Sequence, residues 1–246
     1  MSFAIFSDSS CNLPKAQLEE FQVQIISSSY EREGKLITCP PYPEDFDGHE
    51  YYNFLRNKGV VKTSLIPAAQ MEDAFRPVLA AGEDVLYITL SSGISGTVAS
   101  GLQAAQALME EFPQRQVRVL DSMGAGFGIG LLLGRASDDR KAGLNLDQTY
   151  ASLERDRDNL CEFFTVDDLM FLRRTGRLSG VTATLGTMLQ LKPLLRGDET
   201  GHITVFNKVR GRKRAVETLG DALGSTSMLS IGISFATITR LDLRRI

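Results

Sequence analysis

Three short apolar segments of this chain each end in small polar residues, and this repetition constrains the fold more than any other feature. Residues 3–6, 85–90 and 117–120 run into Asp8-Ser9, Ser91-Ser92 and Asp121-Ser122, respectively. Strands that are apolar on both faces are typical of a parallel sheet that helices cover on both sides. We therefore predict an α/β fold with an N-terminal, mostly parallel, Rossmann-like sheet and helices on both of its faces.

Helical patterns lie between these strands, as a parallel sheet requires. A cap and an early proline predict a helix after Asn12-Leu13-Pro14. We expect a further strand at 23–28 and irregular structure at 32–48. Apolar spacing predicts further helices at 47–57, 68–81, 96–109 and 124–135.

The pattern changes near Asp158, where strands and helices become mixed. We predict a strand in 161–166, an apolar helix in 182–195 closed by a proline, a strand in 201–209 and a helix in 210–223. The expected organisation is an N-terminal domain at 1–157 and a smaller C-terminal α/β domain at 158–246.

Composition places the chain among ordinary globular proteins. Of its 246 residues 43% are hydrophobic and 23% charged, with a net charge of −3. The three cysteines form no CxxC pair, and the start "MSFAIFSDSS" carries no charged leader before a long apolar stretch. We also find no stretch long enough for a transmembrane helix, and we expect a cytoplasmic protein.

Positive charge gathers in one segment. Residues 169–216 hold ten Lys and Arg against two acidic residues, a local charge of +8, so the rest of the chain carries −11. No aromatic residues interleave the basic ones, and we expect no nucleic-acid partner. A basic face suits docking to an acidic or phosphate-carrying partner, although a regulatory protein that binds nucleic acid through this face stays open as an alternative.

No motif for nucleophilic catalysis is complete. Around Ser95 the sequence reads GxSG, where a nucleophile elbow needs GxSxG. The chain has only His49 and His202 as bases, and neither lies in a context that marks a triad. We expect no catalytic residues, with a phosphotransferase or hydrolase on the same scaffold, using Asp121 as base, as the alternative.

Cofactor and metal motifs are also incomplete. Glycines at 124, 126, 128 and 130 follow a strand, but a dinucleotide fingerprint would need glycine where Ile129 or Leu131 stands. These glycines more simply let a helix pack closely. The chain offers few metal-binding side chains: two histidines, three scattered cysteines and the pair Asp167-Asp168. We therefore expect no metal and no cofactor.

Hydroxyl side chains remain as the candidate binding groups. Thr63 lies in the loop before the helix at 68–81, and Ser95 lies in the loop before the helix at 96–109. Ligands of open α/β sheets bind beyond the carboxyl ends of the strands, where these loops lie. Two hydroxyl clusters there could converge on one small anionic or carbonyl group, while Ser92 and Thr97 can serve as helix caps.

Seven ordered blocks between residues 5 and 215 resemble the DegV family, which includes the fatty-acid-binding subunits of bacterial fatty acid kinase. The blocks are "SDSSCNLP", "VVKTSLIPAAQMEDAF", "ITLSSGISGTVAS", "VLDSMGAGFGIG", "FTVDDLMFLRRTGRLSG", "LQLKPLL" and "GHITVFNKVRGRKRA". The resemblance implies a two-domain protein that holds a long-chain, palmitate-like fatty acid in a tunnel between the domains.

The resemblance also implies site residues and a partner. The family's threonine and serine that meet the carboxylate match Thr63 and Ser95, with Ser92 as a weaker candidate. A separate fatty acid kinase is the implied partner, and it would form an acyl phosphate for phospholipid synthesis. The basic segment with Arg173, Arg174 and Arg177 is the expected docking face.

One stretch departs from the family's pattern. Members continue to a block resembling "GTHxGPG", whose histidine joins the carboxylate network. Here no histidine follows His202, and Phe235 stands where members often have one. From about Gly224 the sequence is expected to be truncated or frame-shifted, so the network would be incomplete.

Overall fold

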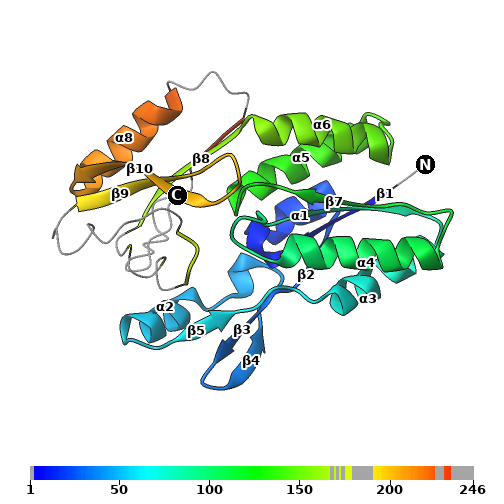
Figure 1. Ribbon diagram of the computed structural model, residues 1–246, viewed down its shortest axis with the longest axis horizontal. Coiled ribbons are helices and arrows are strands. Elements are labelled where there is room, and N and C mark those ends of the chain that lie inside the picture. The colour runs from blue at the N-terminus through cyan, green and yellow to red at the C-terminus, as the bar shows by residue number, and fades with distance from the viewer. Residues whose placement is uncertain are drawn as a thin grey trace.

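The computed structural model of the chain describes residues 3–166, 169, 172, 175–178, 191–224 and 230–233. These residues form three sheets, which we call A, B and C, and the helices that pack on them. Figure 1 shows sheet A and its helices on the right, sheet C with α8 on the left, and sheet B with α2 beneath. Arg173, Arg174 and Phe235 lie outside the described residues.

Sheet A is the predicted parallel sheet. Its strands are β1 (Phe3–Asp8), β2 (Val23–Ile26), β6 (Asp84–Thr89) and β7 (Val117–Asp121), in the order β2-β1-β6-β7. Every neighbouring pair is parallel, with Phe6 opposite Tyr87 and Tyr87 opposite Val119. All residues of β1 and β6 are buried, as expected for strands covered on both faces.

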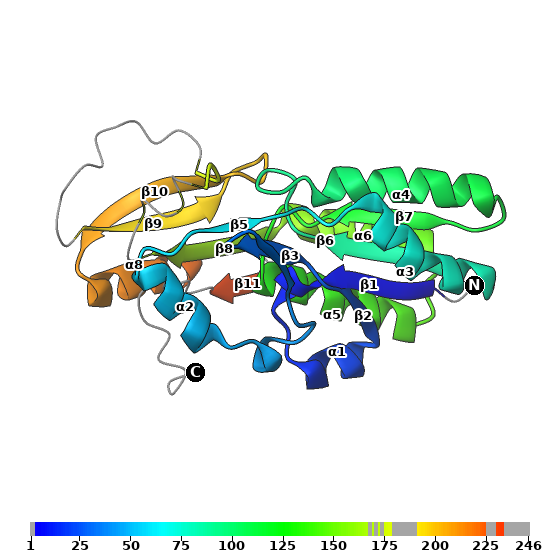
Figure 2. The ribbon, with the colours of Figure 1, turned by 90° about the horizontal axis from the view of Figure 1, so that it is seen from below.

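Helices cover both faces of sheet A, as Figure 2 shows. The helices around this sheet are α1 (Lys15–Phe21), α3 (Ala68–Ala80), α4 (Thr97–Glu111), α5 (Phe127–Lys141) and α6 (Leu146–Asp158). Phe75 of α3 and Leu108 of α4 pack in the core on one face, whereas Ile129 of α5 and Leu153 of α6 pack in the core on the other. The α/β architecture with helices on both faces is therefore confirmed.

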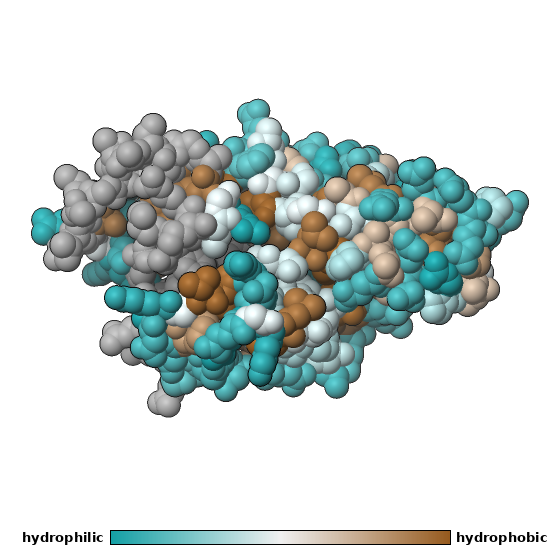
Figure 3. Space-filling model, turned by 60° about the horizontal axis from the view of Figure 1, so that its bottom comes forward, coloured by the Kyte–Doolittle hydropathy of each residue, from teal (hydrophilic) through white to brown (hydrophobic). Residues whose placement is uncertain are grey.

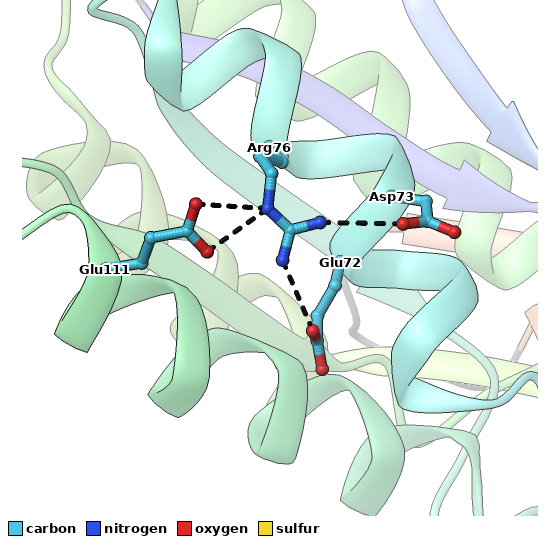
Figure 4. Close-up of polar contacts among 4 residues, drawn as sticks. All are labelled: Glu72, Asp73, Arg76 and Glu111. Atoms are coloured by element: carbon cyan, nitrogen blue, oxygen red, sulfur yellow. Dashed lines mark hydrogen bonds and ion pairs between the residues drawn. The ribbon is translucent and has the colours of Figure 1, made fainter.

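An ion cluster joins α3 to α4 at the surface (Figure 4). Arg76 of α3 donates from Nε to both carboxylate oxygens of Glu111 in α4, at 3.1 Å each. The same guanidinium contacts Glu72 and Asp73 within α3. Because these groups are partly exposed, water screens the cluster, and the apolar contacts beneath it hold the two helices together.

Sheet B is antiparallel and lies in a region where we expected irregular structure. Its strands are β3 (Ser29–Arg32), β4 (Lys35–Thr38) and β5 (Val61–Thr63), in the order β4-β3-β5. The expectation of irregularity at 32–48 was wrong for β4, because Glu33 and Gly34 adopt positive φ and close a tight hairpin. The helix α2 (Gly48–Arg56) follows, close to the predicted 47–57, and Asp47 caps it.

Sheet C has four strands of mixed direction. They are β8 (Leu160–Thr165), β9 (Leu191–Gly197), β10 (Ile203–Arg210) and β11 (Ser230–Ile233), in the order β10-β9-β8-β11. The helix α8 (Arg212–Gly224) packs on it through Ala215 and Leu219. The predicted strand at 201–209 and helix at 210–223 correspond to β10 and α8.

The predicted apolar helix at 182–195 was wrong in its last part. Residues 191–195 belong to β9, which pairs antiparallel with both β8 and β10. Leu194 and Leu195 are fully buried, so an apolar run that suits a helix face also suits a central strand covered by α8. The remaining residues of that prediction lie outside the described part of the chain. The domain boundary at 157/158 stays a prediction.

Candidate functional site

A cavity of about 580 Å³ lies beyond the carboxyl ends of β1 and β6, where sheet B and α2 close over them. Thr63, Ser95 and Arg177 all line it, so three residues that are far apart in sequence meet in one space. All other described lining residues lie within residues 1–97. Among the described lining residues, Arg177 alone comes from the predicted C-terminal domain, which begins at residue 158.

Ser95 lies in the loop that joins β6 to α4, which we call the Ser95 loop (residues 90–96). Its Oγ accepts a hydrogen bond from the Thr97 backbone N–H at 3.2 Å and lies 2.9 Å from Thr97 Oγ1. Thr97 Oγ1 in turn accepts from the backbone N–H of Ile66 at 3.5 Å. Ser95 Oγ therefore accepts from the first backbone N–H of α4 while it lines the cavity, and a hydroxyl can also bind a ligand because it donates once and accepts twice.

Thr63 is the last residue of β5. It pairs with Tyr30 in β3, and the next residue, Ser64, donates its N–H to the carbonyl of Ser29. This pairing fixes the backbone of Thr63 at the cavity, while its side chain remains exposed.

Arg177 connects the two hydroxyl regions. Its guanidinium donates to Thr63 Oγ1 at 3.3 Å and to the carbonyl of Ile94, next to Ser95, at 3.3 Å. A third hydrogen bond to the Thr175 carbonyl, at 2.6 Å, holds the side chain in place. We expected Arg177 on a docking face; its observed contacts place its charge beside Thr63 and the Ser95 loop. A docking role for Arg173, Arg174 and Arg177 stays a prediction.

Ser92 and Asp121 lie outside this cavity. Ser92 is exposed, and its backbone N–H donates to Asp121 Oδ1 at 3.2 Å. The same carboxylate oxygen accepts from the N–H of Met123 at 3.0 Å. Asp121 thus ties the Ser95 loop to the loop after β7, and neither residue is among the described ones that line the cavity.

An aromatic wall, formed by Tyr30, Phe46, Tyr51 and Tyr52, closes the cavity on the side of sheet B and α2. Tyr51 packs edge-on against Tyr30 and Tyr52, with ring centroids 5.2 and 5.3 Å apart. Burial raises the pKa of Tyr51 to about 12 and also raises the pKa of Tyr52, so these phenols stay neutral near pH 7. We did not predict this wall from the sequence, although the adjacent Tyr51 and Tyr52 in a predicted helix were its signal.

The outer surface of the region formed by sheet B and α2 is of mixed polarity. Figure 3 shows apolar residues there as separate brown patches among polar ones. Leu36 of β4 is 70% exposed and Val60, just before β5, is 69% exposed. Scattered apolar side chains of this kind are normal on a protein surface.

Asp8 forms the polar floor of the cavity and was also missed. This carboxylate, at the end of β1, is buried. It accepts hydrogen bonds from the Tyr87 hydroxyl, from Thr89 Oγ1 and from the backbone N–H of Ser10. The Ser10 hydroxyl is a fourth donor, so the buried carboxylate is satisfied and fixes the ends of β1 and β6 relative to each other.

The glycines after β7 make room for a second carboxylate. Glu162 of β8 accepts from the backbone N–H groups of Ala125 and Gly128, at 2.8 and 3.1 Å. An added Cβ at Gly128 would lie 2.5 Å from the carboxylate carbon of Glu162. Burial raises the pKa of Glu162 above its ordinary value, and these two hydrogen bonds lower it in part. Sheet C is thereby joined to the N-terminus of α5.

A second cavity, of about 760 Å³, lies beside Glu162, and the predicted site residues that the structure describes do not line it. Within the described ranges, no group of three or more His, Cys, Asp or Glu side chains could hold a metal ion. In the same part of the chain, no helix combines the length and apolar character needed to cross a membrane. All three cysteines are free thiols.

The sequence matches known proteins over most of its length. The model of a family described as "Uncharacterised protein, DegV family" matches residues 2–233. A DegV domain-containing protein of Clostridium perfringens is 32% identical over 221 residues, which cover 88% of this chain and 74% of that protein. A second, from Lactococcus lactis, is 31% identical over 226 residues, with coverages of 89% and 75%.

Solved structures show the same fold. A DegV family protein from Thermus thermophilus, reported for its fatty acid binding, is 30% identical with a TM-score of 0.79, covering 92% of this chain and 78% of its own. A stearic-acid-binding protein from Eubacterium ventriosum is 26% identical with a TM-score of 0.80, with coverages of 89% and 75%. The fatty acid binding protein DegV of Bacillus subtilis is 28% identical with a TM-score of 0.77, with coverages of 91% and 77%.

Proposed function

This chain belongs to the DegV family, and from that premise we propose that it binds a long-chain fatty acid, such as palmitate, in the cavity beyond sheet A. The carboxylate lies at Thr63 and Ser95, and the acyl chain lies along the aromatic wall. The observation that carries this proposal is that one cavity combines the hydroxyls of Thr63 and Ser95 and the guanidinium of Arg177 with apolar lining. Its volume of about 580 Å³ falls within the range of ligand sites.

The apolar lining supplies most of the affinity for such a ligand. Burying one CH₂ group contributes about 0.8 kcal/mol, so a long acyl chain gains far more than any single hydrogen bond provides. Leu65, Ile66, Leu90 and Ile94 line the cavity together with the aromatic wall. Orientation then falls to polar groups of the lining, among which we assign Thr63, Ser95 and Arg177 to the carboxylate.

The head-group chemistry suits a carboxylate. Thr63 and Ser95 each have a hydroxyl that can donate one hydrogen bond, and Arg177 is a permanent cation with further N–H groups. A guanidinium beside the hydroxyls compensates the negative charge that the ligand brings into a partly buried site. We assign Arg177 to this head-group site because of its contacts with Thr63 and Ile94.

The protein in this proposal is a non-catalytic binding protein. It presents the fatty-acid carboxylate to a fatty acid kinase, which makes an acyl phosphate for phospholipid synthesis. The basic segment with Arg173, Arg174 and Arg177 is the proposed docking face. The support for this partner is the family resemblance and the local charge of +8 in residues 169–216.

Replacing both head-group hydroxyls tests the site. We expect Thr63→Ala/Ser95→Ala to bind palmitate about 10- to 30-fold more weakly, because two hydrogen bonds of about 1 kcal/mol each are lost. Isothermal titration calorimetry measures the affinity. Ser92→Ala is the matched control, since Ser92 lies in the same loop but outside the cavity.

The control variant should bind like the wild type. Unchanged affinity in the double variant, or an equal loss in Ser92→Ala, contradicts the assignment of the carboxylate to Thr63 and Ser95. Circular dichroism shows whether each variant keeps its fold, so that lost binding is not mistaken for unfolding.

A further inference from the structure

The turn between β9 and β10 (residues 198–202, the β9–β10 turn) lies directly against the Ser95 loop. Ser91 is buried, and its Oγ donates a hydrogen bond to the carbonyl of Gly201 at 2.8 Å. The same Oγ accepts from the backbone N–H of Gly93 at 3.1 Å. One hydroxyl therefore holds the loop in its own shape and joins it to sheet C.

Both sides of this contact are glycines that leave no room for a side chain. A Cβ on Gly93 would overlap the backbone of Gly201 and lie 2.6 Å from the backbone nitrogen of His202. A Cβ on Gly201 would overlap Ser91 Oγ, and Gly201 has a φ of +73°. Backbone cannot yield as a flexible side chain does, so the position of the turn determines the position of the loop.

The β9–β10 turn is itself well defined. The Asp198 carboxylate accepts from the Thr200 hydroxyl at 2.7 Å, the Thr200 N–H at 2.9 Å and the His202 N–H at 3.0 Å. The hydrogen bond from the Thr200 hydroxyl is the main reason that the pKa of Asp198 is lowered. Asp198, Thr200 and His202 are exposed, whereas Gly201 is buried against the loop.

Hydrogen bonds within the Ser95 loop connect the contact with Gly201 to Ser95 in the head-group site. The Ser91 carbonyl accepts from the N–H groups of Ile94 and Ser95, at 3.1 and 3.0 Å. Ser91 thus lies between Gly201, which it contacts through its side chain, and Ser95, which it holds through its backbone. Arg177 holds the Ile94 carbonyl of the same loop.

We propose that the β9–β10 turn, through Gly201, is a positioning element that sets the Ser95 hydroxyl for the ligand carboxylate. The inference rests on the proposed function and adds a way in which binding of the carboxylate can be regulated. A displacement of the exposed turn releases the Ser95 loop and weakens the hold on the carboxylate without touching the acyl chain.

The test uses the full chain loaded with [1-¹³C]palmitate. The ¹³C carboxyl resonance reports hydrogen bonding at the head group, and transfer of palmitate to excess phosphatidylcholine vesicles gives the release rate. We expect Gly201→Ala to shift the resonance and to speed release by about tenfold, the equivalent of one or two hydrogen bonds.

Gly211→Ala is the matched control. Gly211 has a φ of +82° and lies at the next turn of the same sheet, with nothing within 4 Å of an added Cβ. Both glycines have positive φ, so both substitutions strain the backbone and should lower the melting temperature, but only Gly201→Ala should change the resonance and the release rate.

Further variants separate the steric contact from simple destabilisation. In Ser91→Ala/Gly201→Ala the overlapping Oγ is gone, and we expect release to return to within about threefold of the Ser91→Ala value. If Gly201→Ala fails to fold, Ser91→Ala alone should shift the resonance and speed release about threefold or more.

Each outcome has one meaning. A wild-type protein without a bound resonance overturns the proposed function and this inference together. A bound wild type with unchanged resonance and release in Gly201→Ala and Ser91→Ala overturns the inference alone. Equal changes in Gly201→Ala and Gly211→Ala also overturn it, because they show a general loss of stability.

Discussion

Arg177→Ala is expected to weaken palmitate binding about 10- to 100-fold, because a hydrogen bond to a charged group contributes about 1.5–3 kcal/mol. The change removes the cation beside Thr63 and frees the Ile94 carbonyl of the Ser95 loop. Arg177→Lys keeps the charge but loses the planar fork that reaches both partners, so its affinity should be intermediate. Calorimetric titration with palmitate measures the affinity of the wild type, Arg177→Ala and Arg177→Lys.

Arg118→Ala is the control for a lost arginine. Arg118 pairs with Asp147 at 2.6 Å and is not among the described residues that line the cavity. We expect it to bind palmitate like the wild type. If Arg177→Ala also binds like the wild type, Arg177 does not belong to the head-group site and keeps only its proposed place on the docking face.

Gly128→Ala is expected to lower the free energy of unfolding by about 2–3 kcal/mol, as overpacking of a filled site does. The new methyl group would lie 2.5 Å from the carboxylate carbon of Glu162 and displace its hydrogen bonds to Ala125 and Gly128. Urea unfolding measures the loss. The cost should fall close to zero in a Glu162→Ala background, where the carboxylate that the methyl group meets is gone.

Gly220→Ala is the matched control, because Gly220 lies inside α8 with nothing within 4 Å of an added Cβ. An unhindered glycine-to-alanine change in a helix should stabilise by about 0.5–1 kcal/mol. A stabilising Gly128→Ala, or an equal cost with and without Glu162, contradicts the view that this glycine exists to admit the carboxylate.

The sequence was sufficient to predict sheet A and to single out two residues, Thr63 and Ser95, that line one cavity. Buried strands such as β1 and β6 are short, continuous apolar runs, and each predicted one lies within two residues of its observed bounds. Ser95 could be placed before α4 because the end of a strand and the start of a helix are both local patterns. We expected Thr63 and Ser95 to converge because their loops precede neighbouring helices, but it is β5 of sheet B that brings Thr63 to the cavity that Ser95 lines.

The missing parts depend on contacts between distant residues. Arg177 lies 114 residues from Thr63, and no local pattern distinguishes an arginine at a head group from one on a surface. Glu162 and Gly128 are likewise paired only by the packing of sheet C on α5. The aromatic wall could not be predicted because its residues come from β3, from the stretch before α2 and from α2, and only the packing of these elements brings the rings together.

Identifying the bound ligand tests the central proposal most directly. Purified protein is denatured, its lipid extract is analysed by mass spectrometry, and the melting temperature of the intact protein is followed as palmitate is added. We predict a co-purified long-chain fatty acid, and stabilisation by about 2.7 kcal/mol when free palmitate reaches 100 times its dissociation constant. A protein that releases no lipid, and whose melting temperature palmitate does not change, contradicts the proposal.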